Sequence, residues 1–228
     1  MEPRRGIYNT LDLGFADGIF GSQRNFVRVF ARNATYYALG KRMVFARSTQ
    51  FGIIRPLTYD VTPLDAVPLA ERLFGGGGSS HRGFPEYQAG PRDPNSGFPL
   101  GGSALFFNQM ELRFPLFGPN LGGVLFHDAG NVFSTLGKMS LRTNQHGLKD
   151  FDYMVHSVGG GVRYRTPVGP VRIDLGYSIN PPYFFGFKGT QQELFNASVN
   201  PCPPDAPNRC VTQNVSHFQF FVSIGQTF

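Results

Sequence analysis

The sequence has no uninterrupted apolar run close to the ~18 residues that a membrane-spanning helix requires. Its mean hydropathy is slightly negative. These two observations exclude helical membrane spans. They leave membrane β-barrels open, because the strands of a barrel alternate apolar and polar residues and average out in hydropathy. The 29 glycines and 18 prolines in 228 residues also argue against a helical protein.

Cysteine is scarce, with only Cys202 and Cys210 in a stretch rich in Pro and Asn. Metal sites usually need more ligands than two thiols. We expect one disulfide in an oxidising compartment, with two free thiols in an exposed loop as the alternative. The start, MEPRRG, lacks the apolar core of a signal peptide. Because a secreted protein needs that segment, we interpret the chain as a mature form, an engineered piece or a fragment.

Positive charge is in excess but is not clustered. The net charge is +6, from 21 basic and 15 acidic residues. A nucleic-acid-binding protein gathers its basic residues on one face. Here the basic residues are scattered along the chain. Examples inside alternating stretches are Arg28, Arg32, Arg113, Arg163 and Arg172. We therefore expect no nucleic-acid partner.

Signatures of enzymes are also missing. The five histidines are dispersed without metal-ligand spacing, and no Gly-x-Ser-x-Gly elbow is present. The glycines at 75–78 are not followed by Lys-Ser or Lys-Thr, so a phosphate-binding loop is not indicated. We expect no catalytic residue, no cofactor and no metal, and not an enzyme. Outer-membrane protease and phospholipase barrels, with catalytic residues at the rim, are the alternative.

What the sequence does contain is a period of two. Apolar residues alternate with polar or small ones in eight stretches, and this pattern predicts β-strands. They span 5–15, 25–38, 42–54, 103–114, 121–133, 155–166, 171–179 and 217–228. Short turns (40–41, 115–120, 167–170) alternate with long loops (55–102, 134–154, 180–216), so one end of the sheet is plain and the other elaborate. This asymmetry predicts an all-β, antiparallel transmembrane β-barrel. A soluble β-sandwich or a lipocalin-like barrel is the alternative.

The long loop 55–102 has a distinctive centre at 75–102. Four consecutive glycines precede Arg82, and prolines follow at 85, 91, 94 and 99. Loops of this length are usually functional or disordered. Two aromatic residues, Phe84 and Tyr87, closely follow the arginine, whereas a flexible linker consists mainly of Gly and Ser. We expect the loop to fold back and dock through Arg82; an exposed loop arginine is the alternative.

Three motifs resemble one family, the outer-membrane assembly factors typified by BamA, with TamA and the two-partner secretion transporters as relatives. The stretch 77–84 resembles its Arg-Gly-Phe/Tyr loop signature, here Arg82, Gly83 and Phe84, with His81 where the family usually has a small apolar residue. Residues 126–132 resemble its Phe-x-Asp-x-Gly-x-Val strand. Residues 157–170 and 218–228 resemble its closing strands and terminal signal. The likeness covers nearly the whole chain, 1–228, as the C-terminal half of a sixteen-stranded barrel without the periplasmic POTRA repeats.

The resemblance implies that Arg82 enters the lumen and pairs with Glu111 and Asp128. Periodicity places Glu111 on the polar face of its strand, where pairing with Arg113 is the alternative. Asp128 shares its parity with Val124 and Phe126, so periodicity alone does not place it inside.

The resemblance also implies a function: folding and inserting client barrel proteins into the bacterial outer membrane through a weak seam between the first and last strands. Its partners would be the bilayer, unfolded outer-membrane proteins, and assembly lipoproteins or a second copy. The terminal signal would comprise Phe220, Ile224, Gly225 and Phe228. The alternatives are a self-contained eight-stranded structural or pore-forming barrel and a two-partner-type translocator.

The number of strands bears on the place of Arg82. A closed eight-stranded barrel is only wide enough for its own side chains. We therefore expect one of two forms: a small closed barrel with Arg82 outside, or a pair of copies with Arg82 inside.

Overall fold

The computed structural model describes residues 3–22, 24–57, 66–118, 120–167, 169–189 and 210–224. The strands are β1 Gly6–Ala16, β2 Phe26–Leu39, β3 Met43–Pro56, β4 Ala104–Phe117, β5 Leu121–Phe133, β6 Val155–Thr166, β7 Gly169–Ser178, β8 Tyr183–Phe187, β9 Cys210–Asn214 and β10 Phe218–Ile224. Short 3-10 turns occupy Gly18–Phe20, Leu69–Glu71 and Leu136–Lys138. In the described part of the chain, no helix is long and apolar enough to cross a membrane.

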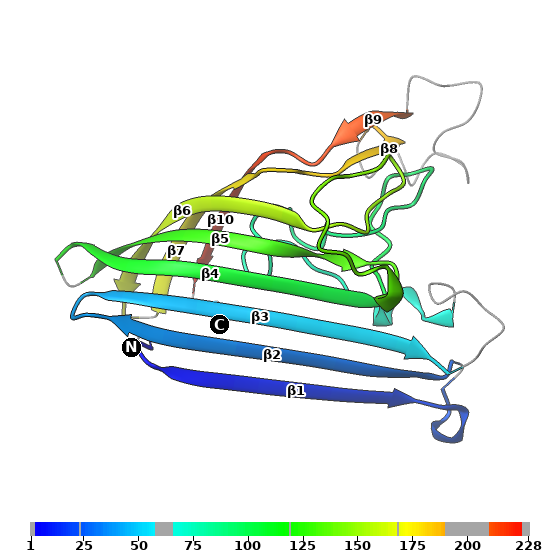
Figure 1. Cartoon of the computed structure of the whole chain (residues 1–228), viewed down its shortest axis with the longest axis horizontal. Helices are drawn as coiled ribbons and strands as arrows, with labels where there is room; N and C mark the ends of the chain where they lie inside the picture. The colour runs from blue at the N-terminus through cyan, green and yellow to red at the C-terminus, as the bar shows by residue number, and fades with distance from the viewer. Residues whose placement is uncertain are drawn as a thin grey trace.

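Eight strands form one antiparallel sheet in the order β1-β2-β3-β4-β5-β6-β7-β10. The predicted all-β antiparallel fold with eight main strands is therefore confirmed. The short β2–β3 and β4–β5 turns lie at one end of the sheet, and the long loops lie at the other (Figure 1). β8 and β9 pair as a separate ribbon inside the predicted loop 180–216. Alternation missed this ribbon because five-residue strands show too few periods.

Strand boundaries agree with the prediction most closely in β5 and β6. β4 differs, because it continues through Pro115 to Phe117 with a register shift between these two residues. A proline, which cannot donate to the ladder, is tolerated at such an irregularity. β10 is described as far as Ile224. Gly225 and Phe228, two of the predicted terminal-signal residues, lie outside the described residues.

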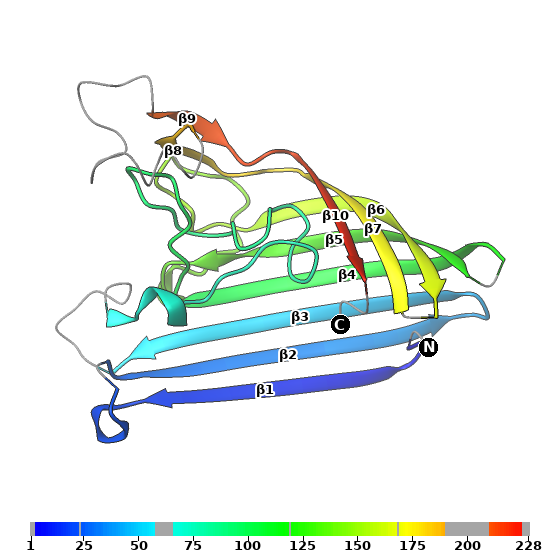
Figure 2. The same cartoon turned by 180° about the vertical axis from the view of Figure 1, so that it is seen from behind.

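The sheet is not closed. Among the described strands β1 pairs only with β2, and β10 only with β7. The two edge strands stand apart at opposite sides of a curved sheet (Figures 1 and 2). Of the two expected forms, the small closed barrel is thus wrong for this chain, and the pair of copies stays a prediction. A curved, open sheet leaves room on its concave face for the loop 66–102, which a closed eight-stranded ring would not.

The two faces of the sheet differ in chemistry. In β7, Arg172 and Asp174 are buried on the concave side, whereas Ile173, Leu175 and Tyr177 are exposed on the convex side. In β10, the convex face carries large exposed apolar groups, Phe218, Phe220, Val222 and Ile224. This is the alternation expected of a barrel with a polar lumen and a lipid-facing exterior.

The convex face carries several polar side chains at the middle of the strands. On β3 and β4, the Arg47 Nε and the Thr49 hydroxyl both donate to Asn108 Oδ1, at 2.8 and 3.0 Å. On β1 and β2, the Asn33 amide donates to Asn9 Oδ1 at 2.6 Å. These side chains satisfy one another, which lowers the cost of placing them in an apolar surrounding.

The position of Arg47 gives a prediction about stability. It lies on the convex face of β3 between Phe45 and Phe51, whereas Arg55 lies on the same face at the end of the strand. A lipid-facing arginine costs about 2–4 kcal/mol at the bilayer midplane and about 0–1 kcal/mol near the interface. We expect Arg47→Leu to raise the free energy of unfolding in lipid vesicles by about 2 kcal/mol, measured by urea titration.

The matched control is Arg55→Leu, for which we expect a change below about 1 kcal/mol because this end of β3 lies near the interface. Equal effects of the two substitutions would contradict the placement of Arg47 at mid-membrane depth.

Candidate functional site

The loop between β3 and β4 is a folded part of the core. Its teal segment lies on the concave side of the sheet, behind β4 and β5 in one view and in front of them in the other (Figures 1 and 2). Leu73 and Gly102 join its two arms through a pair of backbone hydrogen bonds of 3.0 and 2.9 Å. Phe84 is fully buried in the cluster that includes Phe107 of β4 and Val132 of β5. The loop therefore docks by apolar burial as well as by charge.

The glycines before Arg82 are required by a tight turn. Gly76 and Gly77 have φ values of 107° and 92°, a region that favours glycine. The Gly77 N–H donates to the carbonyls of His81 and Phe84, at 3.1 and 3.0 Å. A Cβ on Gly75 would overlap the ring of Phe107. The run of glycines thus lets the backbone curl and approach β4 closely, which presents Arg82 to the sheet.

Arg82 is fully buried and makes four hydrogen bonds to two carboxylates. Its backbone N–H and its Nε donate to Asp128 Oδ2 at 2.9 and 2.8 Å, and its Nη2 donates to Asp128 Oδ1 at 2.8 Å. Its Nη1 donates to Glu111 Oε1 at 2.6 Å. The bidentate contact with Asp128 uses the planar fork of the guanidinium, a geometry that lysine cannot supply.

The carboxylates are held in turn by arginines of the sheet. Arg113 Nε donates to Glu111 Oε2 at 2.8 Å. Arg163 donates to both oxygens of Asp174, at 2.6 and 3.0 Å, and Arg172 Nη2 donates to Asp174 Oδ2 at 3.2 Å. Asp174 Oδ2 lies 3.7 Å from Arg82 Nη1. We call these seven residues the Arg82 network: Arg82, Glu111, Arg113, Asp128, Arg163, Arg172 and Asp174.

Phe126 explains why periodicity did not place Asp128. The ring of Phe126 stacks on the Arg82 guanidinium, with Cζ 3.5 Å from the ring centroid. Val124, Phe126 and Asp128 all face the concave side, with exposed fractions of 1, 5 and 0%. Val124 and Phe126 therefore point inward together with Asp128, whereas Leu125 is exposed on the convex face. Because apolar residues occupy both faces of this strand, parity alone could not place Asp128.

The site requires small side chains on β6 and β7. A Cβ on Gly176 would collide with the carbonyl oxygen of Arg82. A Cβ on Gly83 would lie 2.9 Å from Cβ of Ser157 and 2.9 Å from the His81 ring. Gly176 lies in the register of the polar face of β7, so its strand leaves a space that the Arg82 backbone fills.

The charge of Arg82 is stabilised although burial opposes it. Desolvation acts to lower its pKa, but the attraction of Asp128, followed by Glu111 and Asp174, raises that pKa above its usual value. Removing one partner of such a buried group typically costs about 3–5 kcal/mol, because the remaining charge is left uncompensated.

His81 contributes a neutral imidazole. Its Nε2 is 2.9 Å from the Val155 carbonyl, and the Gly83 N–H donates to its Nδ1 at 3.1 Å. The ring meets Phe84 and Phe107 edge-on, at centroid distances of 5.1 and 5.7 Å. These contacts assign the proton to Nε2, which donates to the carbonyl, and leave Nδ1 as the acceptor. A residue that departs from the family signature thus has its own partners on β6.

Sequence analysis missed four members of the site. Asp174, Arg163 and Arg172 lie on the polar faces of predicted strands, but nothing in a single strand indicates which partner they meet. Phe126 was assigned no role. One signal in the sequence could have indicated Asp174 as a site residue. It lies on the polar face of β7, the strand with the clearest alternation.

The other predicted sites lie away from this network or outside the described residues. Phe220 and Ile224 are exposed on the convex side of β10, on the face opposite to the loop. Cys210 begins β9, and the predicted disulfide stays a prediction. Cys202 lies outside the described residues, so the structure adds nothing on its side of the predicted pairing.

His81 gives a prediction about pH. Burial lowers its pKa from 6.5 to about 4, against the weaker opposing effect of Asp128. The folded state therefore binds fewer protons than the unfolded state between about pH 4 and pH 6.5, and stability falls as the pH falls through this window. We expect the loss to reach about 3 kcal/mol at most, since each pKa unit corresponds to about 1.4 kcal/mol. The measurement is urea unfolding between pH 7.5 and 4.

Two variants separate His81 from the other histidines. His81→Val should flatten the profile in this window, whereas His146→Asn, at an exposed position of another loop, should keep it. An unchanged profile in His81→Val would show that another group titrates.

Comparisons with known proteins agree with this fold. The family model described as the Omp85 superfamily domain matches residues 1–228. A curated relative, the outer membrane protein assembly factor BamA of Nitratidesulfovibrio vulgaris, is 28% identical over 182 residues, which cover 78% of this chain and 21% of the relative.

A solved structure shows the same fold. The BamA of Haemophilus ducreyi lacking POTRA domains 1–3 superposes with a TM-score of 0.65 at 20% identity, covering 97% of this chain and 39% of that one. The chain thus spans about a fifth of the length of the curated relative and less than half of the solved structure. The chain belongs to the Omp85 superfamily.

Proposed function

We propose that this chain is the C-terminal half of the barrel of a BamA-type assembly factor, which folds and inserts client proteins into the outer membrane. Membership of the Omp85 superfamily and the BamA relative place the protein in the bacterial outer membrane. The observation that carries the proposal is the burial of Arg82 against Glu111 and Asp128 on the concave face. The assembly role itself is a proposal that rests on the BamA relative.

In this proposal the Arg82 network fixes the long loop inside the lumen. The loop carries a charge that bridges β4, β5 and β7, so the closing half of the barrel keeps one curvature. A rigid half is useful to an insertase, because opening is then confined to the edges of the sheet. The chemistry needed is binding and alignment of strands; no covalent step is involved.

The two edge strands of the sheet are where client strands and the remaining strands of the barrel would pair. β1 and β10 each pair on one side only in the described residues. Within a bilayer, an unpaired edge leaves backbone N–H and C=O groups unsatisfied, at a cost of several kcal/mol each. We propose that these edges pair with further barrel strands and, at the seam, transiently with a client.

The proposal is tested by reconstitution. The chain is placed in lipid vesicles, and the folding rate of an unfolded outer-membrane barrel protein is measured by its heat-modifiable mobility on gels. We expect the chain to accelerate client folding several-fold over empty vesicles, and Arg82→Ala to remove most of this acceleration. The exposed Arg24 provides the matched control, Arg24→Ala, which should behave as the wild type.

A second measurement reports on the loop directly. Without Arg82, Asp128 and Glu111 lose their common partner, so the loop should detach and become at least tenfold more sensitive to limited proteolysis, as about 1.4 kcal/mol corresponds to one factor of ten. Normal protection in Arg82→Ala would contradict the structural role. A chain that gives no acceleration in its wild-type form would refute the assembly function.

A further inference from the structure

Polar side chains on the convex face form a row that crosses four strands. Each member lies opposite the next in the strand register: Asn9 on β1, Asn33 on β2, Thr49 on β3 and Asn108 on β4. Arg47 lies two residues before Thr49 and therefore on the same face of β3. We call these five residues the convex polar row.

Apolar side chains enclose this row along the strands. On β3, Phe45 precedes Arg47 and Phe51 follows Thr49 on the same face. The headgroups of a bilayer lie outside the apolar band of a barrel. The convex polar row is therefore separated from the headgroups by apolar residues of its own strands.

A hollow of about 400 Å³ adjoins the row. It is lined by polar members of the row and by apolar neighbours, namely Asn9, Leu11, Ala31, Asn33, Thr49 and Phe51. Ala31 stands between Leu11 and Phe51 in the register, so its small side chain leaves a depression between two large ones. Small residues of this kind let two membrane-spanning segments approach closely.

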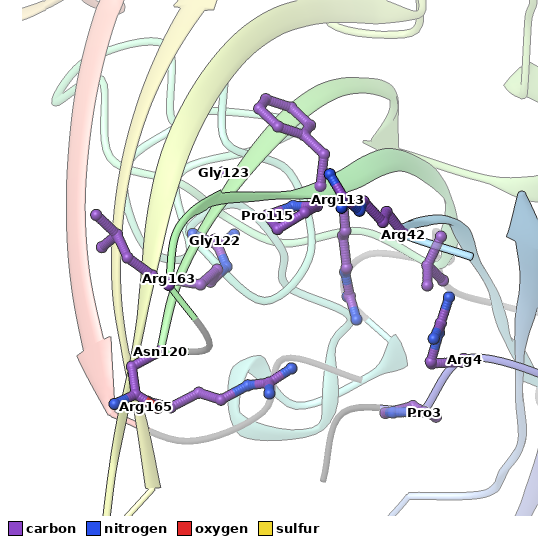
Figure 3. Close-up of a pocket in the computed structure, with 14 residues that line it drawn as sticks. Pro3, Arg4, Arg42, Arg113, Pro115, Asn120, Gly122, Gly123, Arg163 and Arg165 are labelled. Atoms are coloured by element: carbon purple, nitrogen blue, oxygen red, sulfur yellow. The ribbon is translucent and has the colours of Figure 1, made fainter. Parts of the chain in front are cut away.

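Arg47 brings a positive charge that its neighbours do not balance. Its Nε donates to Asn108 Oδ1, but within the described residues its Nη1 and Nη2 have no partner and no carboxylate pairs with it. Arginines on the concave face differ: Arg163, one of the residues that line the pocket in Figure 3, donates to both oxygens of Asp174. Ionisable residues within a membrane are rare and normally paired, and they mark functional sites.

The free end of Arg47 is suited to a carboxylate. The planar fork of a guanidinium binds the two oxygens of a carboxylate together, and the low dielectric of the membrane strengthens this attraction. A second copy of this chain does not offer such a group on its outer wall. In the described strands, the carboxylates all lie on the concave face: Asp12, Glu111, Asp128 and Asp174.

We propose that the convex polar row is a docking surface for a membrane-spanning segment of another protein, which carries a carboxylate at the depth of Arg47. The carboxylate pairs with Nη1 and Nη2 of Arg47, and apolar side chains of the same segment fill the hollow over Ala31. The charge that lowers the stability of the chain alone thus becomes a stabilising contact in the complex. This surface is the outer wall of the sheet, separate from the Arg82 network and from strand pairing at the edges.

The test uses the purified chain in phosphatidylcholine vesicles, with a donor dye on its amino terminus. The probe is an acceptor-labelled peptide of about 20 apolar residues, long enough to span the bilayer, with one glutamate at its centre. Association is measured by energy transfer between the dyes. We expect saturable transfer, and association about fivefold weaker for a matched peptide with glutamine in place of the glutamate, the scale of polar contacts between spanning segments.

Two variants locate the site. Arg47→Leu removes the charge and should weaken association of the glutamate peptide about fivefold. The matched control, Arg55→Leu, removes an exposed arginine from the same face at the end of β3 and should associate as the wild type does. Unchanged protease resistance of the loop 66–102 in both variants shows that each is folded.

Any of four results would overturn the proposal. Two are equal association of the glutamine peptide and unchanged association of Arg47→Leu while the loop stays protected. A third is loss of peptide association when phosphatidylglycerol replaces part of the lipid, which would assign Arg47 to lipid headgroups. The fourth is Arg47-dependent energy transfer between two labelled copies of the chain without peptide, which would make a second copy the occupant. Client folding plays no part in these measurements, so a failure here leaves the proposed function standing, and the converse also holds.

Discussion

The burial of one positive charge, that of Arg82, constrains the rest of this structure. A guanidinium removed from water is tolerated only where carboxylates and hydrogen bonds replace the lost hydration. Three strands that are separate in sequence supply them, through Glu111 on β4, Asp128 on β5 and Asp174 on β7. The loop must therefore be long enough to return over these strands, and β7 must lack a side chain where the Arg82 carbonyl lies, at Gly176. The curvature of the sheet meets the same requirement, because its concave face brings three strands around one side chain.

Strand periodicity was sufficient to predict most of the fold and part of the site. A period of two locates residues on one face, and so β5, β6 and the inward register of Glu111 could be read from the sequence alone. This period fails in a strand whose two faces are both apolar, one toward lipid and the other toward the docked loop. Phe126 is inward because it stacks on Arg82, a contact made by a residue more than forty positions away. The open form of the sheet could not be predicted either, since closure depends on the partners of the two edges rather than on any pattern within a strand. The β8–β9 ribbon is too short to show a period.

On the convex face, too, alternation does not predict every residue, because some positions expected to be apolar are polar. Arg47, Thr49 and Asn108 are polar residues at positions where a lipid-facing strand is expected to be apolar. Their hydrogen bonds cross two strands, so the pairing that makes them tolerable is a property of register, not of local sequence. Cross-strand pairs of this kind stabilise sheets, and here they also lower the cost of polar groups near the middle of the membrane.

The loop is docked by two physically different kinds of contact. Phe84 is buried in the apolar cluster that includes Phe107 and Val132, and such burial is non-directional and scales with the area removed from water. Arg82 is held by Glu111 and Asp128 through contacts that require one geometry of the guanidinium. Apolar burial alone would allow the loop to settle in more than one register on the concave face. The buried charge removes this freedom, because a displaced guanidinium would lose its carboxylates without regaining water.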